Sequence, residues 1–292
     1  MRNHWFGPGG VVAIGIALAI VVSLPMLSNA QAPAGRGRGA APATAKPEPP
    51  AAPAPRFKDG TINLDAVPGQ KGFWNAFNGQ FVGKTGNALP TNLEIADVPF
   101  RPWAKALYDY RRFRNGLDDP HSRCQPAGGL RFWNAPNGTE FIQDPDHNRI
   151  LLIDGENRDW KRIAMEPGRK HPSLDDLNPS YFGDAIGHWE GDTIVVDTIG
   201  FNEKFWAFRN GMPHTRFLHL TERYTRLDMN RIKYEVTIED PGAYTRPFSG
   251  GWYINWQSTN YDGSPNGEIH EYFCIDNERD SEHMPDANEN RP

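Results

Sequence analysis

Hydrophobic and polar residues alternate with a period of two along much of the chain from Glu140 onward. This period is typical of β-strands that bury one face and expose the other. Turn-forming residues separate the alternating segments, which predict these strands: Glu140–Gln143, Asn148–Ile153, Trp160–Met165, Ala185–Trp189, Thr193–Thr198, Phe217–Leu227, Ile232–Glu239, Gly251–Gln257 and Glu268–Ile275. We therefore expect a mainly β fold, an antiparallel meander that forms a lipocalin-like barrel or a sandwich.

One short helix is predicted in the N-terminal part, from Pro102 or Trp103 to Phe113. Proline suits the first turn of a helix, basic residues lie in the last turn, and Gly116 follows its end. The rest of the stretch from Phe57 to Pro136 is rich in Gly, Pro and Asn and has few alternating segments.

The segment from Phe217 to Glu239 has the clearest alternation and predicts a β-hairpin. A three-residue loop, Asp228-Met229-Asn230, pairs Leu227 with Arg231, and counting back gives three more pairs: Tyr224–Tyr234, Glu222–Val236 and Leu220–Ile238. The other face then carries polar cross-strand pairs, Arg223 with Glu235 and His219 with Glu239, as expected for a solvated surface.

Glu222 is the sharpest single-residue candidate, because it is the one carboxylate on the apolar face of this hairpin. A carboxylate in such surroundings acts either as a buried acid or base or as a partner in a salt bridge. For the salt bridge we expect an arginine, such as Arg131 or Arg246.

Aromatic residues make up 12% of the chain and include nine tryptophans. In a β-domain such residues either fill the core or line a pocket for apolar or sugar ligands. The residues that we place near a ligand are Trp206, Trp252, Trp256, Tyr224, Tyr272 and Arg246.

The N-terminus predicts export. Arg2 and His4 precede an apolar run from Val11 to Leu27, and Ser28-Asn29-Ala30 resembles a signal-peptidase cleavage site. An uncleaved anchor is the alternative. We divide the chain into a signal peptide (1–30), a disordered Ala/Pro-rich linker (31–55), a β-rich domain (56–280) and a frayed tail (281–292). The mature chain should be periplasmic or extracellular, without a transmembrane segment.

Charge and motifs exclude several functions. The net charge is −5, and removal of Arg2 with the signal leaves 30 basic and 36 acidic residues, hence −6. Nucleic-acid binding needs clustered basic residues, which are absent from the sequence. The sequence also lacks H-E-x-x-H, G-x-S-x-G, Walker A and G-x-G-x-x-G motifs, so we predict no metal and no cofactor.

Cys124 and Cys274 are the only cysteines. In an oxidising compartment a lone pair most often forms a disulfide, although a catalytic thiol is the alternative. A bond across so long a loop stabilises a fold by about 4–5 kcal/mol in the chain-entropy model. It would tie the loop after Asp119 to the last predicted strand and bring His121 near three residues of the C-terminal strands: His270, Tyr272 and Trp256.

Five motifs stand out between Asp119 and Asn277: Cys124-Gln125-Pro126, GHWEGDTIVVDT (187–198), HLTER (219–223), VTIEDP (236–241) and EYFC (271–274). Together they resemble a large family of exported bacterial proteins of unknown function, which has a G-H/R-W-E-G-D-T-L/I-V-V-D-T hairpin motif. The resemblance implies secretion and a β-rich fold, and it points to no established chemistry.

Three functional hypotheses follow. The first is a module that binds a small apolar or glycosidic molecule in an aromatic-lined pocket. The second is a lyase, hydratase, isomerase or hydrolase in which Glu222 works as acid or base with His121, His188 or His214. The third is an envelope protein that binds no small ligand and recruits a partner through its Pro-rich arm and exposed strands. The sequence predicts no oligomeric state.

Overall fold

The computed structural model describes residues 51–76, 79–134, 138–155, 159–259, 267–269 and 274. The predicted signal peptide, residues 31–50 of the predicted linker and the predicted tail lie outside the described residues. In the part that is described, no helix combines the length and the apolar character needed to cross a membrane.

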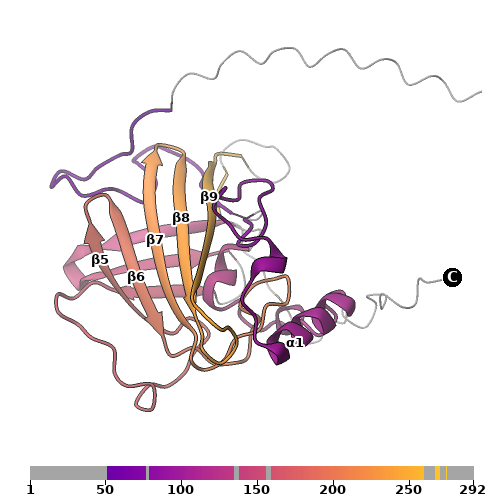
Figure 1. Ribbon diagram of the computed structural model, residues 1–292. Helices are drawn as coiled ribbons and strands as arrows, with labels where there is room; N and C mark the ends of the chain where they lie inside the picture. The colour runs from indigo at the N-terminus through magenta and orange to yellow at the C-terminus, as the bar shows by residue number, and fades with distance from the viewer. Residues whose placement is uncertain are drawn as a thin grey trace, which may run out of the picture. The chain divides into compact units, whose positions relative to one another are not determined.

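The described residues form nine strands in one closed β-barrel (Figure 1). The strands are β1 (Phe73–Asn75), β2 (Thr139–Asp144), β3 (Arg149–Asp154), β4 (Trp160–Ala164), β5 (Asp184–Glu190), β6 (Thr193–Ile199), β7 (His219–Asp228), β8 (Arg231–Glu239) and β9 (Phe248–Gln257). Each strand pairs with the next in the chain, and β9 closes the ring against β1. The mainly β prediction is confirmed, and the fold is a barrel and not a sandwich.

Two strands differ from the prediction. β1 has only three residues and was not predicted, because so short a segment shows no alternation. Conversely, Glu268–Ile275 was predicted as a strand, but its described residues 268, 269 and 274 belong to none.

The meander is interrupted between β4 and β5, which pair in parallel through Ile163↔Ala185 and Ala164↔Ile186. Parallel neighbours cannot be joined by a tight turn. The chain therefore leaves the barrel after β4 and returns to the start of β5 through the crossover segment, residues 165–183. We call this narrow parallel junction the seam of the barrel.

The predicted hairpin register is confirmed for most of β7 and β8, including Tyr224↔Tyr234 and Glu222↔Val236. The loop end differs, because Asp228 and not Leu227 pairs with Arg231. A bulge at Leu227 absorbs the extra residue and turns this side chain to solvent, where it is 42% exposed.

The helix α1 (Pro102–Phe113) confirms the predicted helix, with proline in its first turn and two arginines in its last. The described residues also contain four 3-10 segments: η1 (Ile95–Asp97), η2 (Pro120–Arg123), η3 (Gly129–Asn134) and η4 (Pro145–His147).

The segment η3 fills the lumen of the barrel. All six of its residues are buried. The indole of Trp133 lies against rings from three strands, with centroid distances of 5.7 Å to Phe141, 5.7 Å to Tyr224 and 6.0 Å to Tyr234. Trp133 Nε1 also donates to the Tyr224 hydroxyl at 3.0 Å. The chain thus places its own tryptophan where an open barrel would hold a ligand.

Residues 51–55 lie against the barrel, although their composition assigned them to the linker. The Met229 amide donates to the Ala52 carbonyl at 2.8 Å, and Pro53 bridges to Asp228. These residues run along the end of the barrel that holds the β7–β8 turn (Figure 1). They therefore belong to the folded part of the chain.

Candidate functional site at the barrel seam

The seam leaves β5 without β4 beside its C-terminal half. The parallel pairing covers Ala185 and Ile186, whereas β5 continues to Glu190. Met165, just after β4, packs directly on Gly187, where an added Cβ would lie 2.6 Å from the Met165 sulfur. A side chain at this position would push Met165 away from the strand.

A short loop, residues 56–62, covers this part of the seam. Arg56 bridges to Ile62, and the Phe57 amide donates to the Thr61 carbonyl at 2.9 Å. The Arg56 guanidinium binds Asp192 in the β5–β6 turn through two hydrogen bonds of 2.8 and 2.5 Å. Gln143 on β2 holds the other end, since its side-chain amide contacts the Ile62 carbonyl at 3.0 Å.

Between this loop, the seam and the β2–β3 turn lies a cavity of about 680 Å³, which we call the seam pocket. Its apolar lining comes from four residues: Phe57, Ile150, Met165 and Trp189. Its polar lining comes from Lys58, Asp59, Thr61, Gln143, Asp144, Asn148 and Arg149, and Pro145 completes the lining. Phe57 is 43% exposed and Trp189 is half-buried, so both rings present apolar surface to the cavity.

Glu222 lies in the lumen, where two tyrosine hydroxyls donate to its Oε1, Tyr224 at 2.7 Å and Tyr234 at 3.0 Å. Its Oε2 forms an ion pair with the ammonium of Lys161 on β4 and lies 3.5 Å from Thr198 Oγ1. A carboxylate has about four acceptor sites, so these donors saturate it. Burial, with the nearby Glu222 charge, raises the pKa of both tyrosines well above the ordinary range.

The prediction that Arg131 or Arg246 pairs with Glu222 is wrong. Arg131 instead binds Asp119 through two hydrogen bonds of 2.6 and 2.7 Å, and Arg246 is exposed beside Pro247. Lys161 takes their place because it points inward from β4, next to the buried Ile163.

The three histidines proposed to assist Glu222 lie apart from it. The side chain of His188 is 60% exposed and faces Glu190. The ring of His121 lies 2.9 Å from the Gln125 carbonyl. His214 is buried against Phe205, and its Nε2 lies 3.0 Å from the Phe205 carbonyl, while burial lowers its pKa.

Three of the aromatic candidates are core residues. Trp206, Trp252 and Tyr224 are at most 3% exposed. Trp252 packs against Tyr234 in a tilted arrangement with a centroid distance of 4.6 Å, and the Arg111 guanidinium lies over Trp206 at 4.9 Å. In the seam pocket the aromatic lining comes from Phe57 and Trp189, which the sequence analysis did not propose as ligand-binding residues.

Trp256 lines a second, polar pocket of about 410 Å³ at the end of β9, together with amide and hydroxyl side chains. Two of these amides bind each other, Asn75 Nδ2 donating to Gln257 Oε1 at 2.5 Å. Tyr272 and His270 lie outside the described residues.

The predicted disulfide between Cys124 and Cys274 is confirmed, with a Cα–Cα distance of 5.4 Å. Cys124 directly follows η2. The Asp119 side chain fixes the first turn of η2 by accepting a hydrogen bond from the His121 amide. The bond thus anchors the C-terminal part of the chain to this loop.

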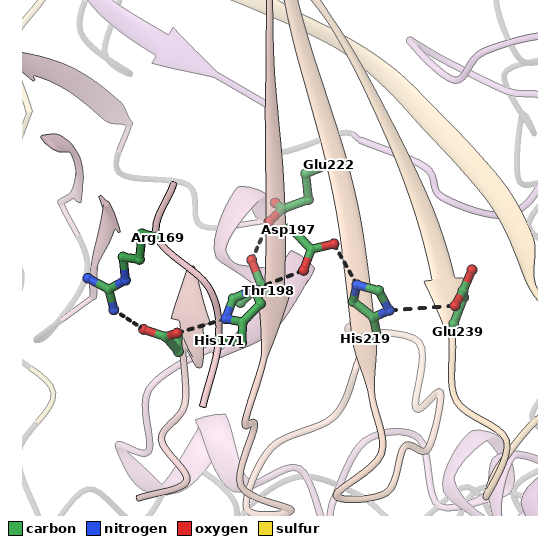
Figure 2. A network of polar contacts seen from close by, with 8 residues as sticks. Arg169, His171, Asp197, Thr198, His219, Glu222 and Glu239 are labelled. Carbon is green, nitrogen blue, oxygen red and sulfur yellow. Dashed lines mark hydrogen bonds and ion pairs between the residues drawn. The ribbon is translucent and has the colours of Figure 1, made fainter. Parts of the chain in front are cut away.

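A second polar cluster lies on the outer face of the barrel, where Asp197 on β6 contacts two histidines (Figure 2). Its carboxylate oxygens lie 2.8 Å from His171 Nε2 and 2.7 Å from His219 Nε2. The predicted contact of His219 with Glu239 is present at 3.5 Å. Arg223 lies opposite Glu235 in the register, as predicted, and its guanidinium binds Glu190 at 2.8 Å.

His171 belongs to the crossover segment, and its Nδ1 lies 2.7 Å from Asp184 on β5. Together with the ion pair between Arg169 and Asp184, these contacts hold the crossover against the barrel wall (Figure 2). Among the described residues no group of three or more His, Cys, Asp or Glu side chains is placed to hold a metal ion.

Comparison of the chain with protein-family models, with curated proteins and with solved structures finds no match. The resemblance to a family of exported proteins therefore stays a prediction.

Proposed function

We propose that this protein binds a small, largely apolar molecule in the seam pocket. The observation that carries the proposal is the cavity itself, about 680 Å³ in volume and lined by Phe57, Ile150, Met165 and Trp189. Ligand pockets commonly measure about 300–1,000 Å³ and combine apolar walls with a few polar groups. Large apolar side chains left open to solvent often mark such sites.

The lumen is a poorer candidate for the ligand. Trp133 from η3 occupies it and contacts rings of β2, β7 and β8. The carboxylate there is also fully engaged, since Lys161, Thr198 and two tyrosines donate to Glu222. A carboxylate so occupied cannot take a proton from a substrate until one of these contacts breaks, which favours binding over catalysis.

We further propose that the protein works outside the cytoplasm, in the periplasm or beyond it. The disulfide between Cys124 and Cys274 supports this, because such bonds persist in oxidising compartments. The signal-like residues 1–30 support it independently.

Isothermal titration with 1-decanol tests the binding proposal. The wild-type protein should bind the alcohol, and Trp189→Ala should weaken binding about ten-fold or more, because a large apolar contact surface is lost. Trp160→Ala is the matched control, since Trp160 lies on β4, is 57% exposed and does not line the seam pocket. Absence of binding, or an equal loss in both variants, would refute the proposal.

A further inference from the structure

The polar lining of the seam pocket contains two cationic side chains with unused hydrogen-bond donors. Within the described part of the chain, the Lys58 ammonium makes no hydrogen bond or ion pair. Arg149 uses its Nε to bind Asp144 at 2.8 Å, which leaves the terminal nitrogens of its guanidinium for another partner. Ammonium and guanidinium groups donate only, so their remaining partners must be acceptors.

The two acidic side chains of the pocket are already engaged. Asp144 accepts a hydrogen bond from Arg149, and its oxygens lie 2.9 Å from His147 Nδ1. Both contacts lower the pKa of this carboxyl, the contact with His147 more than the contact with Arg149. Asp59 accepts from the Thr61 amide at 2.9 Å, which lowers its pKa as well. The pocket thus has spare donors with positive charge, whereas its carboxylates have local partners.

The cationic groups also flank the apolar lining. Lys58 directly follows Phe57 in the covering loop, and Arg149 directly precedes Ile150 on β3. A charged ligand group near Lys58 or Arg149 would therefore leave the rest of the molecule beside apolar walls.

We infer that the ligand is an amphipathic anion, an apolar molecule with a carboxylate or similar acidic head group. The head group contacts Lys58 and the free guanidinium nitrogens of Arg149, and the apolar part packs against Phe57, Met165 and Trp189. This inference rests on the proposed function of the seam pocket and names its ligand class.

Titration calorimetry with three probes of equal chain length tests the inference: decanoate, 1-decanol and decyltrimethylammonium. At neutral pH and low ionic strength, decanoate should bind about three- to five-fold more tightly than 1-decanol, the range of a solvent-exposed charge contact. The cationic probe should bind most weakly. Added salt should reduce the advantage of decanoate, since it screens exposed charges.

Lys58→Met should remove most of the preference for decanoate over 1-decanol. Lys84→Met is the control, because Lys84 is exposed and lies outside the pocket. Lys58→Glu should favour the cationic probe. Equal affinity for all three probes, unchanged by Lys58→Met, would overturn the head-group inference and leave the seam pocket as a binding site. Failure of every probe to bind would overturn both.

Discussion

The lumen and the seam pocket both contain aromatic side chains, which are packed together in the lumen and partly exposed in the seam pocket. In the lumen, Trp133, Tyr224, Tyr234 and Trp252 are at most 2% exposed and contact one another. At the seam, Phe57 is 43% exposed and faces a cavity with the half-buried Trp189. Aromatic content alone therefore does not reveal where a ligand binds.

The difference arises from what the chain places in each space. The segment η3 enters the barrel and fills it, so the strands close around their own residues. The seam is spanned by only two parallel residue pairs, and the loop at 56–62 covers it without filling it. We therefore expect the packed lumen to carry stability, and we propose the seam pocket as the binding site.

The largest effect should come from breaking the ion pair in the lumen. Lys161→Ala leaves Glu222 buried without its counter-charge, and we expect a loss of about 3–5 kcal/mol in the free energy of unfolding. Urea denaturation measures it. The double variant Lys161→Met with Glu222→Gln should recover much of the loss, since it removes both charges. A Lys161→Ala protein as stable as the wild type would show that the lumen does not carry stability.

Loss of the disulfide should have the next largest effect. Cys124→Ser with Cys274→Ser should lower the free energy of unfolding by about 2–5 kcal/mol, because the unfolded chain gains freedom. Affinity of the folded variant for 1-decanol should not change, since neither cysteine lines the seam pocket. Denaturation and titration of the same sample separate the two effects. A matching loss of affinity would show that the bond also shapes the pocket.

A smaller effect should appear in the pH dependence of stability. Burial lowers the pKa of His214 in the folded protein, so the unfolded chain, with a histidine pKa of about 6.5, takes up the proton more readily. Stability from this residue is present above that pH and lost as the pH falls, by at most about 1.4 kcal/mol per pH unit. On acidification the wild type should lose more of its free energy of unfolding than His214→Phe. An equal loss in both proteins would show that burial does not lower the pKa of His214.

Alternation predicted much of the barrel because it reports which face of a strand is buried. It set the register of β7 and β8 and placed Glu222 on the inner face. It failed to find Lys161 as the partner, because β4 buries this lysine and leaves the neighbouring Trp160 57% exposed. Hydropathy favours the opposite orientation, and only pairing with β3 fixes the observed one.

The seam pocket was beyond sequence analysis for a different reason. Its residues come from the loop at 56–62, from β2 and β3, from Met165 and from β5. They meet only because β4 and β5 pair in parallel, which nothing in their local patterns indicates. The disulfide was predictable, since the chain offers only two cysteines.

Photoaffinity labelling distinguishes a ligand held in the seam pocket from a ligand held in the lumen. The probe is a diazirine derivative of 1-decanol, and the labelled protein is digested and sequenced by mass spectrometry. We expect label on peptides that contain Phe57, Met165 or Trp189, and less label in the presence of excess 1-decanol. Label on peptides that contain Trp133, Tyr234 or Trp252 would contradict this expectation.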